Sequence, residues 1–197
     1  MLRRLPVIPT LLVLAAVAVM VRLGFWQIDR MHQKEAMLDQ FRLAASSTEI
    51  SQWPSAGDRG QARQALQYRK VQATCARVIG QSATAGFNAA GESGWRHLAF
   101  CEMAQGYNRG EVVLGWSRNP QSPVWQGGAV QGTFVMAGQS NARVFADPPL
   151  AGLEPNARPD PNDLPNNHLA YAVQWFLFAL TALAIYALAL RKRLSGN

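Results

Sequence analysis

The chain has 197 residues, and two long apolar stretches near its ends leave a more polar middle segment that is large enough to bury its own core. The formal net charge is +7, but a basic group lies directly outside each apolar stretch, namely Arg3, Arg4, Arg191, Lys192 and Arg193. The remaining Lys and Arg residues are scattered among acids, without a basic stripe interleaved with aromatic residues, and this pattern argues against nucleic-acid binding.

The first apolar stretch predicts a transmembrane helix over residues 9–26, after a cytoplasmic N-terminus at residues 1–8. No charge occurs between Leu5 and Val21, and Trp26 follows at a position that suits a membrane interface. A cleavable signal peptide is the alternative, because Arg3 and Arg4 precede the apolar run and residues 16–18 (AVA) resemble a cleavage site. Apolar residues then recur at helical spacing, which predicts a helical extension over residues 27–47.

The middle segment, residues 48–147, is expected to form a β-rich domain. Short β-prone runs are separated by Gly, Asn and Pro, and they cover residues 68–79, 95–102, 111–116, 129–137 and 142–145. Residues 53–60 have the composition of a loop. Several short strands with turn signals between them predict a small antiparallel sheet or a partly closed barrel.

The two cysteines of the chain, Cys75 and Cys101, both lie in predicted strands of this domain. One interpretation is a pair of buried small hydrophobic residues. The other is a disulfide between two strands, which an oxidising compartment permits. Sequence does not provide the Cα separation that decides between these interpretations.

The last part of the chain returns to the membrane. Residues 148–166 are rich in Pro and predict an extended, stiff connector. Residues 167–190 predict a second transmembrane helix, and a basic tail follows at residues 191–197. The positive-inside rule places both termini in the cytoplasm and the β-rich domain in the periplasm. The expected fold class is therefore membrane α+β, with two transmembrane helices flanking a small antiparallel β-rich extracytoplasmic domain.

No pattern in the chain indicates a catalytic centre. The three histidines, His32, His97 and His168, are not at metal-ligand spacing, and the common nucleophile, phosphate-binding and zinc-protease motifs do not occur. We therefore expect a protein that acts without turnover rather than an enzyme.

A polar stripe opens the second transmembrane helix, where His168, Tyr171 and Trp175 share one helical face. In a purely structural interpretation, Asn166 or Asn167 caps the helix and the three side chains are interfacial anchors. In a functional interpretation, the imidazole at the bilayer edge binds haem iron while the aromatic rings pack against the porphyrin.

Four segments carry a resemblance to a known family. Residues 23–27 (LGFWQ), with Arg30 and Lys34, are similar to the motif LGxWQxxRxxxK, and residues 166–175 (NNHLAYAVQW) are similar to NNHxxYAxxW. Residues 68–71 (YRKV) and 112–118 (VVLGWSR) are similar to two further stretches that the family carries. On these motifs the chain resembles the surfeit locus protein family of cytochrome c oxidase assembly factors.

This resemblance implies an assembly factor for haem-copper cytochrome c oxidase that binds haem a and assists its insertion into subunit I. His168 is then the candidate iron ligand. The candidate contacts for haem or the oxidase subunit are Tyr171, Trp175, Trp26, Gln27 and Arg30, with the Arg30 guanidinium able to pair with a propionate. The alternative is a membrane scaffold that stabilises immature subunit I without binding haem.

The resemblance also implies partners and a location. The expected partners are subunit I of the oxidase, haem a synthase and membrane lipid. The expected location is the bacterial inner membrane, with the chain crossing it twice.

Overall fold

The computed structural model describes residues 6–55, 60–104, 109–137 and 141–195. The predicted topology signals Arg3 and Arg4 lie outside these residues. The chain divides into two compact units, one made of Met1–Leu38 and Pro165–Asn197 and the other of Asp39–Leu164. Each unit is described separately.

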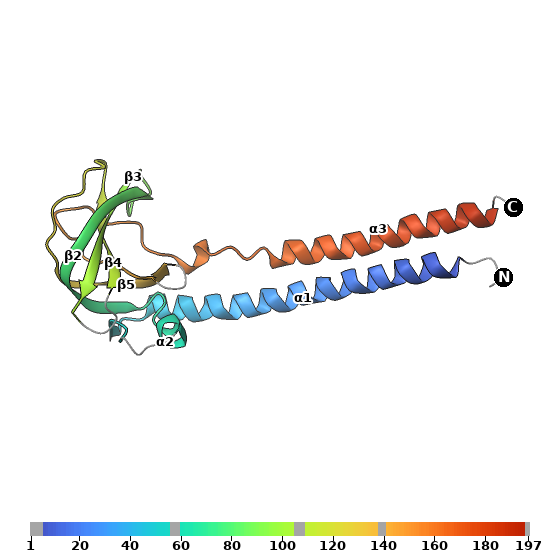
Figure 1. Ribbon diagram of the computed structural model, residues 1–197, viewed down its shortest axis with the longest axis horizontal. Helices are drawn as coiled ribbons and strands as arrows, with labels where there is room; N and C mark the ends of the chain where they lie inside the picture. Colours follow the sequence, from blue (N-terminus) through green and yellow to red (C-terminus); the bar gives the residue numbers. More distant parts are fainter. Residues whose placement is uncertain (1–5, 56–59, 105–108, 138–140, 196–197) are drawn as a thin grey trace. The chain divides into compact units, whose positions relative to one another are not determined.

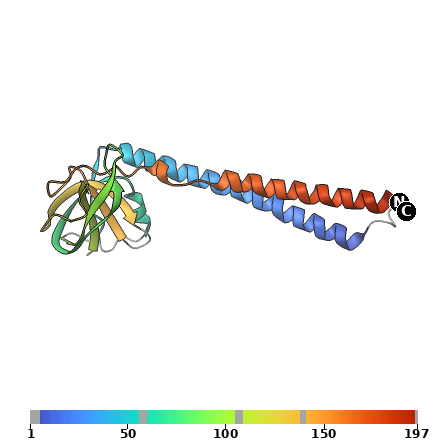
Figure 2. The ribbon, with the colours of Figure 1, turned by 90° about the horizontal axis from the view of Figure 1, so that it is seen from above.

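The first unit is a pair of long helices. Helix α1 runs from Val7 to Ser46, with its residues up to Leu38 in this unit, and α3 runs from His168 to Ser195. The two helices lie side by side in both views (Figures 1 and 2). Both contain a stretch long and apolar enough to cross a membrane. Large apolar side chains such as Leu12 and Ile185 are exposed along them, which is consistent with a membrane protein.

The two helices pack in opposite directions. Their contacts pair Thr10 with Tyr186 near the start of α1, and Gln27 with His168 farther along it. The less exposed side chains repeat at intervals of three and four residues on both helices. One such series on α1 is Thr10, Val13, Val17, Met20, Gly24, Gln27 and Met31, and one on α3 is His168, Ala172, Trp175, Ala179, Ala182 and Tyr186. This spacing is the pattern of two helices packed along a common seam.

The second unit contains a mixed six-stranded sheet. Its strands are β1 (Ile50–Gln52), β2 (Lys70–Phe87), β3 (Ser93–Met103), β4 (Arg109–Ser117), β5 (Gly128–Ala137) and β6 (Asn141–Ala146), in the order β1-β2-β3-β4-β6-β5. Each of the five predicted β-prone runs lies within or overlaps one of these strands, so the prediction of a small β-rich domain between two apolar helices is confirmed. The three-residue strand β1 was not predicted.

The sheet is not antiparallel throughout, because β1 pairs parallel with β2 and β4 pairs parallel with β6. Strands β5 and β6 form an antiparallel hairpin, and β6 lies between β5 and β4 in the sheet, where it pairs parallel with β4. Strand β2 is also longer than predicted. Its first part pairs with β5 and its later part pairs with β3, so the sheet curls back on itself (Figure 2).

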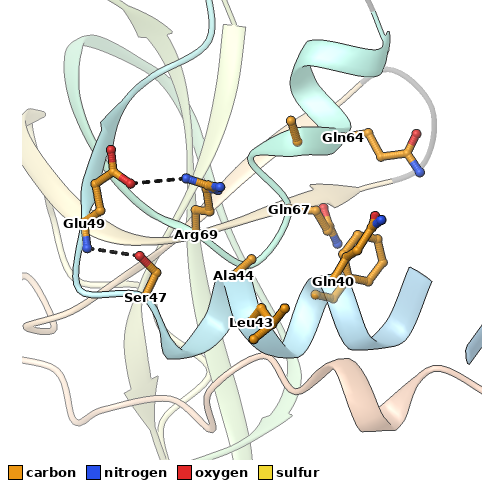
Figure 3. A pocket seen from close by; sticks show the side chains of 10 residues that line it. Gln40, Leu43, Ala44, Ser47, Glu49, Gln64, Gln67 and Arg69 are labelled. Carbon is orange, nitrogen blue, oxygen red and sulfur yellow. Dashed lines mark hydrogen bonds and ion pairs between the residues drawn. The ribbon is translucent and has the colours of Figure 1, made fainter. Parts of the chain in front are cut away.

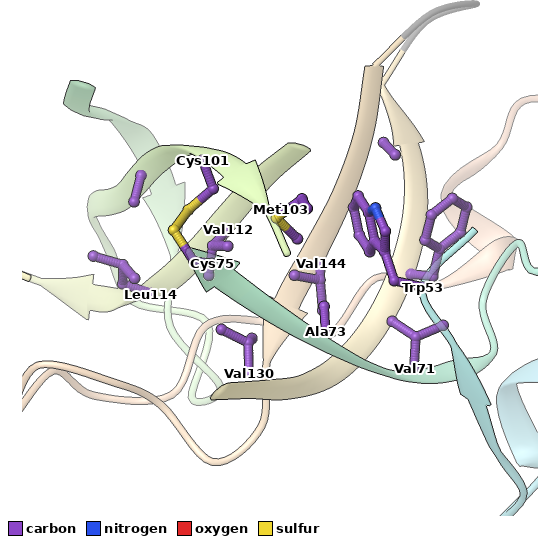
Figure 4. Close-up of a cluster of buried hydrophobic side chains, with 13 residues drawn as sticks. Trp53, Val71, Ala73, Cys75, Cys101, Met103, Val112, Leu114, Val130 and Val144 are labelled. Carbon is purple, nitrogen blue, oxygen red and sulfur yellow. A yellow bond between two sulfur atoms is a disulfide. The ribbon is translucent and has the colours of Figure 1, made fainter. Parts of the chain in front are cut away.

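The concave side of this curled sheet encloses the core (Figure 4). Aliphatic side chains from five strands are fully or almost fully buried there, among them Val71, Val112, Leu114, Val130 and Val144. The Trp53 ring packs edge-on against Phe134, with 5.7 Å between the ring centroids. Burial of this apolar surface is the main stabilising contribution to the domain.

Cys75 and Cys101 form a disulfide between β2 and β3, with their Cα atoms 5.4 Å apart. Both residues are also buried in the core. The structure therefore shows the cross-strand disulfide rather than two free thiols, and the bond fixes two neighbouring strands whose pairing contains register shifts.

The chain that enters and leaves the sheet is fixed to it. Phe41, in the last turns of α1, packs against Tyr68 with 5.3 Å between the ring centroids. Glu154 of the Pro-rich stretch exchanges two backbone hydrogen bonds with Trp116 of β4, of 2.8 and 3.0 Å. Two short elements that sequence did not predict, α2 (Gly60–Ala65) and the 3-10 turn η2 (Pro161–Asp163), complete the described part of this unit.

Candidate functional site

The helix pair brings the two family-like motifs into contact through one hydrogen bond. The Nδ1 atom of His168, the first residue of α3, lies 2.7 Å from the amide oxygen Oε1 of Gln27 on α1. An amide oxygen only accepts hydrogen bonds, so Nδ1 is the donor and carries the proton. In a neutral imidazole the lone pair then resides on Nε2.

The backbone at the start of α3 sets the position of this imidazole. The Asn167 carbonyl accepts a hydrogen bond from the Tyr171 N–H at 3.2 Å, so Asn167 occupies the N-cap position. His168 therefore lies in the first turn of the helix and faces α1. The side-chain oxygen of the neighbouring Asn166 is buried and has no hydrogen-bond partner among the described residues.

The aromatic candidates lie on both sides of the seam. Tyr171 is 51% exposed and Trp26 is 50% exposed, so both present large surfaces outside the helix contact. Trp175 is half-buried and packs edge-on against Phe178, with ring centroids 6.1 Å apart. Trp26 lies next to Gln27 on α1, and Tyr171 and Trp175 lie about one and two helical turns after His168 on α3.

Arg30 lies one helical turn after Gln27 on α1. Its guanidinium is exposed and donates a hydrogen bond from Nη1 to Oε1 of Gln33 at 2.8 Å. An exposed guanidinium with a neutral partner remains available to pair with a carboxylate. Of the six predicted site residues, the structure joins Gln27 and His168 directly.

Three residues of this helix contact were not singled out from sequence. A Cβ placed on Gly24 would lie 2.6 Å from the Phe176 ring, so a side chain there would force that ring to move. Phe25 packs edge-on against the same ring at 5.4 Å. Gly24 and Phe25 belong to the LGFWQ motif, and that motif was the available signal for both. Phe176 follows the second motif directly.

The hydrogen bond from Nδ1 gives the His168 imidazole a defined orientation. Histidines that bind a metal donate the N–H of one ring nitrogen to a neighbouring acceptor, which fixes the ring and leaves the other nitrogen for the metal. The Gln27–His168 pair has this form, and Trp26, Arg30 and Tyr171 lie within about one helical turn of it along α1 and α3. The residues present therefore fit haem iron ligated through Nε2 of His168.

Another histidine, His97, has a different environment inside the β unit. It is fully buried, and its Nε2 and Nδ1 atoms lie 2.8 Å from Ser117 Oγ and 3.2 Å from Ser122 Oγ. Ser117 Oγ donates in turn to the Asn119 carbonyl at 2.9 Å. Burial lowers the pKa of the His97 imidazole, and a hydrogen bond with the Asn119 backbone opposes this shift. His97 thus holds the loop after β4 rather than facing a ligand.

A cavity of about 460 Å³ opens beside the last turns of α1 in the β unit (Figure 3). Its charged lining groups, Glu49 and Arg69, pair with each other at 3.5 Å, and Ser47 Oγ accepts from the Glu49 N–H. The amide oxygen of Gln67 accepts from the Met136 N–H at 2.7 Å. These lining groups are used within the chain, so the cavity offers few groups to a ligand. Among the described residues, no group of three or more His, Cys, Asp or Glu side chains is placed to hold a metal ion.

Comparison with known proteins identifies a family. The model of the SURF1 family matches residues 14–180, which include both motifs that meet at the Gln27–His168 contact. No curated protein sequence matches the chain.

Proposed function

The chain belongs to the SURF1 family, which is known for cytochrome oxidase assembly, and on that premise we propose that it binds haem a through His168 and assists haem insertion into oxidase subunit I. The observation that carries the proposal is the 2.7 Å hydrogen bond between His168 and Gln27. It joins residues 141 positions apart in the chain and leaves Nε2 of the imidazole available to iron. When bound, haem a would supply an iron that accepts a nitrogen ligand, and His168 would supply that ligand.

The surrounding residues have complementary roles in this proposal. Gln27 fixes the tautomer and the orientation of His168. Trp26, Tyr171 and Trp175 offer aromatic faces to a porphyrin, and Arg30 offers a guanidinium to a propionate.

We also propose that both termini are cytoplasmic and that the β unit lies in the periplasm of a bacterial inner membrane. The basic residues Arg191, Lys192 and Arg193 at the end of α3 support this orientation. The Cys75–Cys101 disulfide supports it independently, because such bonds persist in oxidising compartments. Reporter fusions to the β unit and to the C-terminus test this topology. Activity of an alkaline phosphatase fused at the C-terminus would refute it, because that enzyme requires export.

The test of the haem proposal is the visible absorption spectrum of detergent-purified protein that has been co-expressed with the enzymes of haem a synthesis. We expect a haem a band in the wild type and its loss in His168→Ala. The matched control is His32→Ala, which removes an exposed histidine of α1 and should keep the band. Absence of a band from the wild type, with the protein folded and oxidase assembly still dependent on it, would refute haem binding and favour the scaffold function.

A further inference from the structure

The β unit contains a second cavity, far smaller than a porphyrin requires. Its volume is about 250 Å³, and its walls come from the β5–β6 hairpin and from residues 155–159 of the Pro-rich stretch. Thr133 and Phe145, which are cross-strand neighbours in that hairpin, form one wall. Pro155, Asn156 and Pro159 form the other. A volume below the usual range for small-molecule ligands suits a single side chain.

Asn156 is the unusual residue of this cavity. It is only 9% exposed, and both polar atoms of its side chain, Nδ2 and Oδ1, are buried without a hydrogen-bond partner among the described residues. Buried polar side chains are nearly always hydrogen-bonded, because loss of hydration is otherwise uncompensated. A buried amide with two unused groups, facing a cavity, therefore indicates a missing partner.

The backbone around Asn156 holds this amide in place. The Pro155 carbonyl accepts a hydrogen bond from Ala89 N–H at 3.0 Å, and Ala157 N–H donates to the Phe87 carbonyl at 2.9 Å. These bonds pair the segment with the end of β2, where Asn88 is the bridge partner of Asn156. The amide of Asn156 is thus presented by a fixed backbone.

Asn88 shows how the same chain treats a buried asparagine that has no ligand role. It is 6% exposed, and its Nδ2 donates to Glu92 at 3.0 Å. Its Oδ1 accepts from the N–H groups of Ala90 and Glu92. Asn88 uses both polar atoms of its side chain and Asn156 uses neither, so the missing hydrogen bonds are specific to Asn156 and not a general property of buried asparagines in this domain.

The unused atoms of Asn156 define the chemistry of the missing partner. One donor and one acceptor lie side by side on an amide, so a carboxylate would satisfy the donor alone and an ammonium the acceptor alone. A trans peptide group presents its N–H and C=O in opposite directions and cannot pair with both. A primary carboxamide presents them side by side and can form two parallel hydrogen bonds with Asn156.

The charges at the cavity agree with a neutral ligand. Asp147 and Arg158 both line it and form an exposed ion pair with each other, with Nη2 and Oδ2 3.3 Å apart. Because the charges of Asp147 and Arg158 are opposite and paired, they favour neither an anionic nor a cationic ligand in this cavity. We propose that this cavity binds the side-chain carboxamide of a Gln or Asn residue on a partner polypeptide, recognised by Asn156.

The experiment uses the full chain in detergent micelles, labelled with ¹⁵N at asparagine. The side-chain amide signal of Asn156 is assigned by its loss in Asn156→Leu, and the signal of Asn88 is the internal control. Three small probes are titrated, namely propionamide, N-methylacetamide and propionate. A fourth probe is a Gly-Gln-Gly peptide with both ends blocked, which presents the carboxamide on a polypeptide.

We expect a saturable shift of the Asn156 signal with propionamide and with the blocked peptide, and no shift with the other two probes. The Asn88 signal should not move. No saturable shift with propionamide, or an equal shift with propionate, would overturn the proposal. Binding of propionamide without binding of the peptide would overturn the assignment to a polypeptide.

A second measurement distinguishes a ligand site from an amide that ordered water satisfies. Asn156→Leu removes both unused polar atoms while keeping similar volume, so we expect the unfolding midpoint without ligand to stay the same or rise. Asn88→Leu breaks three side-chain hydrogen bonds and should lower the midpoint. A comparable loss in both variants would show that Asn156 has a structural role and would refute the ligand site.

Discussion

Gln27 and His168 face each other across the helix pair, with the imidazole Nδ1 donating to the amide oxygen at 2.7 Å. The contact depends on a close approach of the helices, which Gly24 permits at Phe176. Each motif on its own describes one segment of one helix. Their contact gives Nε2 of His168 a defined direction, because the other nitrogen of the imidazole is held by Gln27.

The first prediction concerns the role of Gln27 in orienting His168. Gln27→Leu removes the acceptor of the His168 N–H, so the imidazole loses its fixed tautomer and direction. We expect the affinity for haem a to fall about 10- to 100-fold, the usual effect of removing such a supporting group. Titration followed by visible absorption measures this change.

The control for that variant is Gln174→Leu, on the exposed side of α3. Its affinity for haem a should equal that of the wild type. If Gln27→Leu also bound haem as the wild type does, the hydrogen bond would have no part in ligand positioning.

The second prediction concerns the contact between Gly24 and Phe176. Gly24→Leu places a side chain where the Phe176 ring lies, and overpacking of this kind costs about 1–3 kcal/mol. Truncation of the ring in Phe176→Ala should recover part of this cost in the double variant. Unfolding in detergent of the four proteins of this double-mutant cycle gives the coupling energy.

Ala18→Leu is the matched control, because Ala18 is exposed on the same helix. It should change stability by less than about 0.5 kcal/mol. Additive effects of Gly24→Leu and Phe176→Ala would contradict a direct contact between these residues.

The third prediction concerns the disulfide in the β unit. Cys75 and Cys101 are separated by 26 residues, and closure of such a loop stabilises a folded domain by about 3.5 kcal/mol in the chain-entropy model. The double variant Cys75→Ala, Cys101→Ala should therefore lose roughly this free energy of unfolding. Denaturant unfolding of the oxidised protein and of the variant measures the difference.

The same samples provide a direct check of the bond. Mass spectrometry without reduction should show the wild type two hydrogens lighter than the reduced form. Two free thiols in protein purified from an oxidising compartment would contradict the bond.

The fourth prediction concerns the pH dependence introduced by His97. Burial lowers the pKa of this imidazole in the folded protein, whereas in the unfolded chain it is about 6.5. The unfolded state then binds more protons below pH 6.5, so the free energy of unfolding falls as the pH drops through 6.5 toward the lower folded pKa. The slope for one proton cannot exceed about 1.4 kcal/mol per pH unit.

Denaturant unfolding between about pH 7.5 and about pH 5.5, one unit on either side of the unfolded pKa, measures this slope. His97→Gln should flatten it, whatever its effect on stability at neutral pH. His32→Ala, which removes an exposed histidine, should keep the wild-type slope. An unchanged slope in His97→Gln would assign the pH dependence to other groups.

Sequence by itself determined the parts of this protein that depend on local patterns. Charge-free apolar runs long enough for a membrane predicted the helices, and alternating runs broken by Gly and Pro predicted strands β2 to β6. The motifs predicted both His168 and Gln27 as site residues, since each residue lies in a segment that is similar to a family motif, and the SURF1 family model covers both segments.

Tertiary structure decided what depends on contacts between distant residues. The parallel pairing of β6 with β4, the pairing of the first part of β2 with β5 and the bond between Cys75 and Cys101 all come from partners far along the chain. A short strand such as β1 has too few residues to form a pattern, and its neighbour β2 alone fixes it. The direction of the His168 imidazole and the two unused atoms of Asn156 likewise follow from packing, because a side chain's partners are set by the space around it and not by the residues beside it in sequence.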